Sequence, residues 1–179
     1  MEKEALEFAR EAHAEQKRKY TEEPYIEHPK RVAELVKTVE HTSEMICAAY
    51  LHDVVEDTPV SLKEIEERFG KEVAGLVEEL TDEYMNEKYP HLNRKKRKEK
   101  EVARQAEMSV QAKTIKLADV IDNTRDIVVN DENFARRYIP EMEALTNVLR
   151  EGHPQLFEQA WYEVQRGKDI LKDKRRKAY

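Results

Sequence analysis

The sequence contains few residues that break helices or form tight turns. Its 179 residues include only four glycines and six prolines. Ala, Leu, Glu, Lys and Arg, which favour helices, are abundant instead. A fold of many short strands needs more turn residues than this chain supplies. We therefore expect an all-α fold, a single domain over residues 1–179 formed by a bundle of about eight to ten helices.

Cysteines and long apolar runs are also scarce. The single cysteine, Cys47, lies in the apolar stretch MICAAYL, where a buried and unreactive thiol is expected, and no second cysteine is available for a disulfide. No apolar run is long enough to span a bilayer, and the initial MEKEALEFAR alternates charged and apolar residues, unlike a signal peptide. We therefore expect a cytoplasmic protein with no membrane partner.

An excess of positive charge is absent, since the formal net charge is −6. This balance argues against a nucleic-acid partner bound through a broad positive field. An anionic ligand would need a local basic patch. The densest cationic run is NRKKRKEK, residues 93–100, which we interpret first as a solvated helix face and only second as a binding surface.

Apolar residues at helical spacing predict the helices, with Ser43 and the Ser61–Glu64 pair as caps and Gly70 as a separator between two helices. Tyr84 to Asn93 is polar, contains Pro90 and is expected to form an ordered loop. The predicted helices span residues 4–18, 29–39, 43–57, 61–69, 71–81, 93–112, 112–129, 132–139 and 141–150, and the last begins at Pro154.

The segment LHDVVEDT, residues 51–58, places four ionisable side chains in an otherwise apolar predicted helix. His52 and Glu56 are four residues apart, as are Asp53 and Asp57, so the two pairs lie on one side of a helix. One pair can ligate a cation while the other acts on a substrate. Because a His-Asp dipeptide alone more often marks a surface or hydrogen-bonded histidine, a metal site requires further ligands.

Two further candidate ligands interrupt segments that otherwise have the pattern of buried helices. His28 precedes Pro29 at a predicted helix start, and Asp119 lies in the apolar segment KLADVIDN. Burying imidazoles and carboxylates is costly unless a partner satisfies them. One divalent cation would satisfy four groups together, namely His28, His52, Asp53 and Asp119. The alternative is a salt-bridge network. We favour the cation because the segment that carries His52 and Asp53 also carries the unpaired carboxylates of Glu56 and Asp57, whose charge a cation would neutralise. A mixed set of imidazole and carboxylate ligands suits Mn²⁺, Fe²⁺, Co²⁺ or Zn²⁺.

Three segments, in this order, resemble a known family. They are AREAHAEQKRKYTEEPYIEHPKRVAEL, AAYLHDVVEDT and TIKLADVIDNTRDI, and they lie between about Ala9 and Tyr138. They resemble the hydrolase domain of RelA/SpoT-type proteins in the HD superfamily and, more closely, its small stand-alone relatives. The resemblance implies an HD-type helical domain with further helices over residues 140–179. It also implies an enzyme that removes the 3′-diphosphate of the alarmones ppGpp and pppGpp, giving pyrophosphate and GDP or GTP.

The resemblance assigns roles to individual residues. It implies a Mn²⁺ cofactor held by His28, His52, Asp53 and Asp119. Glu56 and Asp57 match the acidic pair that positions and activates the attacking water. The matches to substrate contacts are Asn123 at the nucleoside sugar, Arg18 and Lys19 at the guanine base and phosphates, and, on a looser match, Arg125, Arg136 and Tyr138.

The sequence departs from the family pattern at two places. The usual KLADRL motif reads KLADVID here, and the loop after Lys19 differs in length from that of the long bifunctional enzymes. We expect neither departure to touch a predicted ligand, so both bear on base and phosphate recognition. No segment resembles the family's synthetase domain, and hydrolysis without synthesis is therefore expected.

Two other functions stay open at this point. Another HD phosphohydrolase, acting on a nucleoside monophosphate or on NADPH, would share the metal site. A non-catalytic helical protein would instead use the basic run from Arg94 to bind nucleic acid or a partner, with a strong salt dependence. The remaining histidines lie outside the motifs and are expected at the surface: His13, His41, His91 and His153.

Overall fold

The computed structural model describes residues 1–177, and within them the fold is all-α, as predicted. The described residues contain no β-strand and only an isolated bridge between Lys17 and Pro24. The helices are α1 (Glu2–Ala12), α2 (Glu27–Val36), α3 (Ser43–Leu51), α4 (Val54–Asp57), α5 (Leu62–Phe69), α6 (Lys71–Leu80), α7 (Arg94–Gln105), α8 (Val110–Asn130), α9 (Glu132–Val148) and α10 (Pro154–Lys177).

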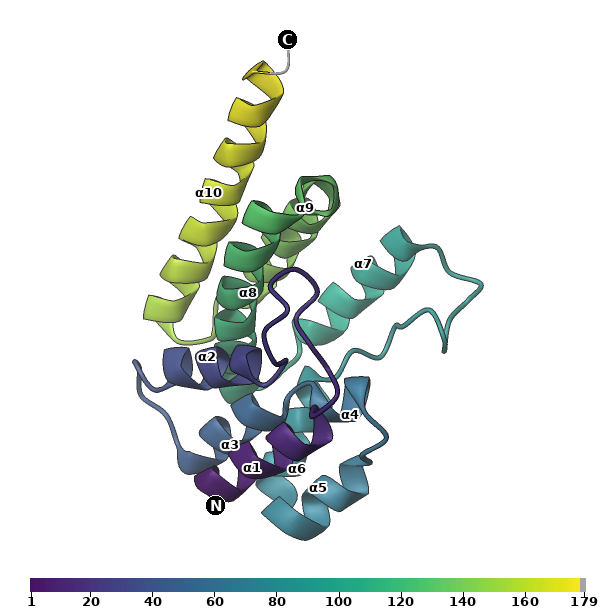
Figure 1. Ribbon diagram of the computed structural model, residues 1–179, viewed down its shortest axis with the longest axis vertical. Coiled ribbons are helices and arrows are strands. Elements are labelled where there is room, and N and C mark those ends of the chain that lie inside the picture. Colours follow the sequence, from purple (N-terminus) through teal and green to yellow (C-terminus); the bar gives the residue numbers. More distant parts are fainter. Residues whose placement is uncertain (178–179) are drawn as a thin grey trace.

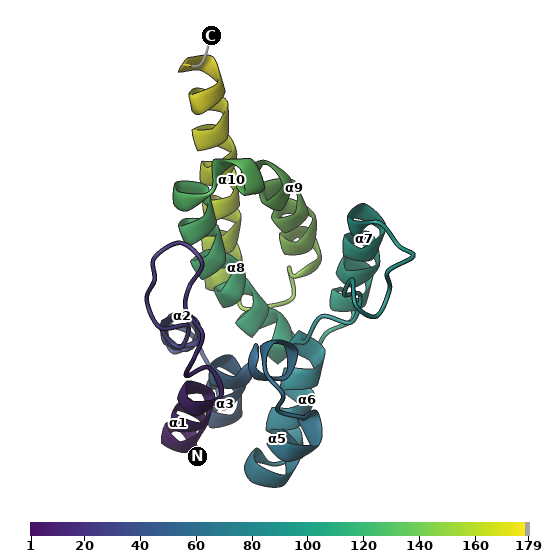
Figure 2. The ribbon, with the colours of Figure 1, turned by 45° about the vertical axis from the view of Figure 1, so that its right-hand side comes forward.

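Helix α8 connects the two ends of the molecule. Helix α10 runs along it from Thr114 to Val128, and α9, α2, α3 and α6 also pack against it (Figures 1 and 2). Its side chains are buried on several faces, among them Ile115, Leu117 and Ile121, which are fully buried. Because these contacts fix α8 from both sides, a polar side chain on it has a well-defined position.

Several helix boundaries follow the capping residues that the sequence indicated. The Ser61 side chain accepts a hydrogen bond from the Glu64 backbone N–H (3.3 Å) at the start of α5. Gly70 has a φ of +88°, a left-handed conformation that favours glycine, and it separates α5 from α6. At α3 the capping residue is Thr42, whose side chain accepts from Met45, so the predicted cap at Ser43 is one residue too late.

Other predicted boundaries are wrong for identifiable reasons. The first helix ends at Ala12 because the chain then turns into the loop before α2. The two helices predicted around Pro140 form one helix, α9, with the proline inside it. A proline inside a helix costs roughly 3 kcal/mol. Buried Ile139 and Leu145 lie on either side of Pro140, and their packing offsets this cost.

The helix predicted over residues 43–57 is interrupted at His52 and Asp53, between α3 and α4. On a continuous helix, neighbouring side chains diverge by about 100° and do not face each other. At this interruption both residues keep right-handed helical dihedrals, and the His52 Nε2 atom lies 3.1 Å from the Asp53 Oδ2 atom. The sequence pattern showed an unbroken helix because the flanking apolar residues continue through it.

Cys47 is fully buried, as expected, and burial raises the pKa of its thiol to about 11. The thiol is therefore protonated and unreactive at neutral pH. Among the described residues, none of the helices combines the length and the apolar character that crossing a bilayer requires.

Two glycines are predicted to respond to alanine substitution with opposite signs. A Cβ at Gly152 would lie 2.7 Å from the Leu117 Cδ1 atom and 3.1 Å from backbone atoms of Lys113 and Thr114 on α8. Gly152→Ala should therefore lower the free energy of unfolding by about 1–3 kcal/mol. A Cβ at Gly75, inside α6, meets no atom within 4 Å. Gly75→Ala should therefore raise the free energy of unfolding by about 0.5–1 kcal/mol.

Urea unfolding followed by circular dichroism measures both changes. Equal effects of the two substitutions would show that α8 does not approach the chain closely at Gly152.

Candidate metal centre

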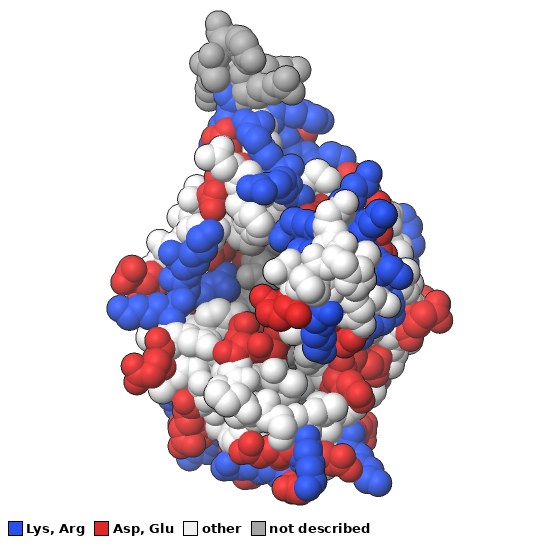
Figure 3. Space-filling view, turned by 90° about the vertical axis from the view of Figure 1, so that its right-hand side faces the viewer, with Lys and Arg blue, Asp and Glu red and all other residues white. Residues whose placement is uncertain are grey.

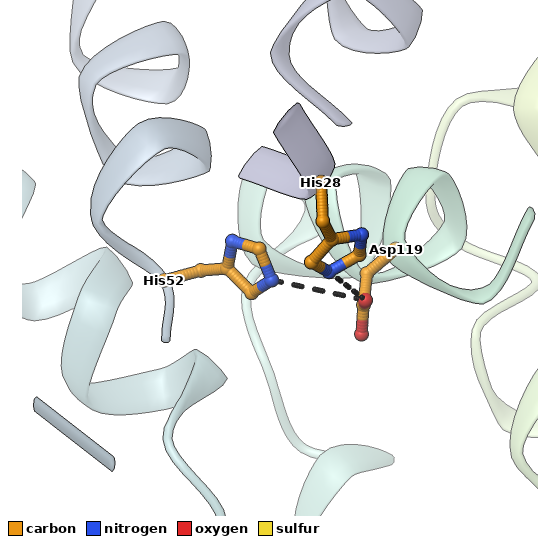
Figure 4. A group of neighbouring side chains, drawn as sticks. All are labelled: His28, His52 and Asp119. Carbon is orange, nitrogen blue, oxygen red and sulfur yellow. Dashed lines mark ion pairs between the residues drawn. The ribbon is translucent and has the colours of Figure 1, made fainter. Parts of the chain in front are cut away.

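His28, His52 and Asp119 converge at one point in the interior (Figure 4). Each offers one ligand atom, and these atoms lie within 4.8 Å of one another. The Asp119 Oδ1 atom is 3.2 Å from His28 Nε2 and 3.7 Å from His52 Nε2. All three residues are buried. The grouping of two imidazoles and a carboxylate around one point makes this a possible metal site.

Three separate elements bring these residues together. His28 lies in the first turn of α2, Asp119 in the middle of α8, and His52 at the interruption between α3 and α4. Since α8 packs against both α2 and α3, it holds its carboxylate against the two imidazoles.

The hydrogen bonds of the imidazoles leave both Nε2 atoms free to ligate. His52 Nδ1 donates to the backbone carbonyl of Ala49 (2.9 Å), and His28 Nδ1 donates to the Asp122 carboxylate (2.7 Å). A neutral imidazole that donates from Nδ1 carries its lone pair on Nε2. Among the described residues, His52 Nε2 is buried without a hydrogen-bond partner. A bound divalent cation fits this arrangement, because it would occupy the orphaned lone pair.

Asp53 lies beside the three converging residues. Its Oδ2 atom is 3.1 Å from His52 Nε2 and 3.6 Å from His28 Nε2. The same oxygen accepts a hydrogen bond from the Tyr25 hydroxyl (2.8 Å). The structure thus places all four predicted ligands together, and their assignment as ligands stays a prediction.

The electrostatics show strong coupling within this group. Burial disfavours the charged form of His52, but the carboxylates of Asp53 and Asp119 outweigh it and raise its pKa well above the usual value. Without a cation these carboxylates favour a proton on Nε2, and a bound cation would take the place of that proton. Burial likewise disfavours the Asp119 carboxylate, but Lys116 and the two imidazoles hold its pKa well below the usual range. Lys116 lies three residues before Asp119, and its Nζ atom is 2.9 Å from Asp119 Oδ2, so it is the local charge partner of this carboxylate.

The acidic pair of α4 lies next to this group. Glu56 is exposed at the surface, but the surrounding protein partly desolvates its carboxylate, and this desolvation and the nearby Asp82 charge raise its pKa to about 7. The Asp82 backbone N–H, which donates to Glu56 Oε2 at 3.0 Å, acts in the opposite direction. Desolvation and the charge of Asp53 raise the pKa of Asp57. Gln16 Nε2 donates to the Asp57 backbone carbonyl (2.7 Å) and ties α4 to the loop after α1.

A cavity of about 150 Å³ opens beside Asp119, between α7, α8 and α9. Seen from the side of α7, the surface is hollowed near its centre, with acidic side chains below the hollow and Lys and Arg side chains above and beside it (Figure 3). The charged or polar lining residues are Asp82, Lys98, Glu101, Gln105, Lys116, Asp119, Asn123, Tyr138 and Glu141.

The basic run of residues 93–100 forms the first turns of α7 and is mostly exposed, which agrees with a solvated helix face. Lys98 differs from its neighbours because it lines the cavity and pairs with Asp82 at 2.9 Å. Arg94 pairs with Glu141 of α9 (2.8 Å). These two ion pairs hold α7 against the cavity.

Four of the predicted substrate contacts lie in two places: two line the cavity, and two lie on the loop between α1 and α2. Asn123 and Tyr138 line the cavity. Arg18 is buried and donates to Asn123 Oδ1 (3.1 Å) and Asp126 Oδ2 (2.7 Å), and its Nε atom has no hydrogen-bond partner among the described residues. The Lys19 side chain is 72% exposed, and its Nζ atom lies 3.5 Å from Asp131 Oδ2.

Arg125 and Arg136 are not among the residues lining this cavity. Arg125 Nε donates to Glu163 of α10 (2.8 Å), and Arg136 pairs with Glu132 one turn before it on α9. Their contact with a substrate stays a prediction.

Sequence reasoning missed Asp122, which lies within the segment VID that departs from the family motif. We expected that the departure from the KLADRL motif would not touch a predicted ligand. This expectation is wrong, because Asp122 accepts a hydrogen bond from His28. Its spacing of one helical turn from Asp119 was the available signal.

His13 is the second residue that sequence reasoning misplaced, since it is 2% exposed and not at the surface. Its ring packs against Tyr25 at 4.8 Å, and its Nδ1 atom lies 2.7 Å from Gln16 Oε1. His41 and His91 are exposed, as expected, and His153 is half-buried.

Comparison with known proteins identifies the family. A sequence model of the HD domain matches residues 5–145. The chain belongs to the HD domain family.

Relatives of this HD domain include two proteins named guanosine-3′,5′-bis(diphosphate) 3′-pyrophosphohydrolase MESH1. The Drosophila melanogaster protein is 40% identical over 130 residues, covering 71% of this chain and 69% of the relative. The Mus musculus protein is 35% identical over 171 residues, covering 87% and 92%. A solved structure described as a metazoan orthologue of SpoT that hydrolyses ppGpp matches with a TM-score of 0.82 and 33% identity, covering 94% of this chain and 96% of that one.

Divalent cations are expected to stabilise this HD domain. A ligand that binds only the folded state at 100 times its Kd stabilises it by about 2.7 kcal/mol, which raises Tm by several degrees. Asp119→Asn should abolish most of this rise because the variant loses a charged ligand from the centre. The measurement is thermal unfolding with MnCl2 or with EDTA.

Asp126→Asn is the matched control, since Asp126 lies on the same helix and pairs with Arg18. A cation-induced rise in Tm that persists in Asp119→Asn and vanishes in Asp126→Asn would contradict the assignment.

Proposed function

We propose that this HD domain hydrolyses ppGpp and pppGpp, removing the 3′-diphosphate as pyrophosphate and leaving GDP or GTP. The observation that carries the proposal is the convergence of His28, His52 and Asp119 beside an acidic pair and a charged cavity. The names of the relatives, which match this chain over most of its length, support the same substrate.

The cofactor we propose is Mn²⁺, or another divalent transition metal, held by His28, His52, Asp53 and Asp119. Two imidazole Nε2 atoms and two carboxylates form a mixed donor set that suits such ions. When bound, the ion supplies Lewis-acid chemistry, lowering the pKa of a water and polarising a phosphoryl oxygen.

Glu56 and Asp57 are proposed to position the attacking water and accept its proton. A general base works best when its pKa lies near the operating pH. Desolvation and the charge of Asp82 bring the pKa of Glu56 to about 7, which meets this condition. The backbone N–H of Asp82 holds one carboxylate oxygen and leaves the other for the water.

The substrate carries several negative charges, and basic groups around the hollow offset the acid of the interior. Lys98 and Lys116 line the cavity, and Arg18 and Lys19 lie on the loop before α2. The cavity of about 150 Å³ is smaller than the roughly 300–1,000 Å³ of typical ligand pockets. We infer that the 3′-diphosphate enters the cavity while the nucleoside lies in the open hollow, near Asn123 and Tyr138.

The remaining expectations are proposals of the same kind. We infer that residues 1–179 form one HD-type domain, and the packing of α8 against five other helices supports this. Its partner is a small nucleotide, with neither nucleic acid nor membrane as a ligand, and its compartment is the cytoplasm.

Product identification tests the activity. The purified protein with MnCl2 should convert ppGpp to GDP and pyrophosphate, with slower or no release of phosphate from NADPH and nucleoside monophosphates. Glu56→Gln should lower kcat by roughly 100-fold or more, because removing a general base costs on the order of 10²–10⁴-fold. The variant should still bind Mn²⁺, since Glu56 is not a proposed ligand. Release of a single phosphate from NADPH as the preferred reaction would refute the substrate assignment.

The pH dependence follows from Glu56. Only the ionised carboxylate accepts a proton, so kcat should rise with pH through a limb at or below about pH 7, because the bound cation also favours the carboxylate. Asp82→Asn removes one negative neighbour, lowers the pKa of Glu56 and should move this limb to lower pH. The measurement is kcat between pH 5 and pH 9 for both proteins. A limb that stays in place would mean that another group limits the reaction.

A further inference from the structure

Asp122 is a buried carboxylate that touches the metal centre from outside. It lies one turn after Asp119 on α8, and its side chain is 8% exposed. Its Oδ2 atom accepts from His28 Nδ1 (2.7 Å), and its Oδ1 atom accepts from Arg31 Nε (2.7 Å). Neither oxygen faces the point where the ligand atoms converge, because each is engaged by a donor on α2.

Both partners of Asp122 demand an acceptor. Arg31 has no acceptor atom at all, and His28 ligates through Nε2 only when Nδ1 carries the proton and donates it. A side chain at this position must therefore accept two hydrogen bonds, one on each terminal atom. Among side chains of this shape only the carboxylate does so, since an asparagine offers one acceptor and one donor.

Arg31 is held in place on its other side. Its NH1 atom donates to Glu23 Oε1 at 2.9 Å, and the Glu23 backbone carbonyl accepts from the Arg18 backbone N–H (2.9 Å). The chain of contacts thus runs from His28 through Asp122 and Arg31 to the loop that carries Arg18 and Lys19. It fixes the orientation of the His28 ring relative to this loop.

We propose that Asp122 is a positioning residue of the metal centre, which locks His28 with its proton on Nδ1 and its lone pair on Nε2, while Arg31 orients Asp122. This inference rests on the metal centre of the proposed function. Partners of this kind orient a ligating histidine, and their loss typically weakens metal binding by roughly 10–100-fold.

The isosteric variant Asp122→Asn makes a specific prediction. Arg31 requires the amide oxygen, which turns the amide N–H group toward His28 Nδ1. His28 Nδ1 must then accept, and the proton moves to Nε2, where it blocks ligation. With Zn²⁺ as a diamagnetic probe, calorimetry should show roughly 10–100-fold weaker binding in Asp122→Asn.

A second substitution separates this effect from simple loss of stability. In the double variant Arg31→Met with Asp122→Asn, the amide is free to turn its oxygen to His28, so Zn²⁺ affinity should return most of the way to that of the wild type. The matched control is Asp126→Asn, another carboxylate on α8 that pairs with an arginine at 2.7 Å. It should leave Zn²⁺ affinity unchanged.

Long-range ¹H–¹⁵N spectra of the Zn²⁺-loaded protein report the tautomer directly. The wild type and the double variant should show His28 protonated at Nδ1 and ligated through Nε2, and Asp122→Asn alone should lose this signature. Wild-type affinity in Asp122→Asn, an unchanged His28 spectrum or the absence of rescue would each overturn the inference. If the wild type bound no divalent cation, the metal centre itself would fail; if it bound Zn²⁺ and hydrolysed ppGpp regardless of Asp122, only this inference would fail.

Discussion

The structure is organised around buried imidazoles and carboxylates that face one another with too few protons and donors to satisfy them. His52 Nε2 is buried without a hydrogen-bond partner among the described residues, and two carboxylates lie within 4 Å of it. Burial of such groups costs several kcal/mol unless a partner compensates. A divalent cation is the partner that matches both the lone pairs and the charge, so the interior and the chemistry share one requirement.

The helices around this point are arranged to hold it rigid. Helix α8 packs along much of its length, and it carries Asp119 toward the centre and Asp122 toward the back of His28. His52 and Asp53 lie at the interruption between α3 and α4, and their side chains meet at the same point. The acidic pair follows at once on α4, so the proposed metal ligands and the proposed proton acceptors lie on one short segment.

Charged side chains around the hollow are the second feature that bears on ligand binding. On the face that contains the hollow, acidic side chains lie below it and basic side chains lie above and beside it (Figure 3). Lys98 and Arg94 are engaged by Asp82 and Glu141 across the cavity, so these cations are already close to where an anionic ligand would lie. A phosphate group would compete with these carboxylates for the same cations. This arrangement is consistent with the proposed polyanionic substrate, although the chain has an overall negative charge.

The sequence by itself determined the all-α class, most helix positions and the residues that meet at the centre. It did so because capping residues, the spacing of apolar residues, and histidines and aspartates within apolar segments can all be recognised in short stretches of sequence. Tertiary structure alone decided the break at His52, the continuity of α9 through Pro140, and the burial of His13. It also decided that Asp122 engages His28 and Arg31. These features depend on which helices pack together, because burial, hydrogen-bond partners and the offset of local costs come from residues distant in sequence.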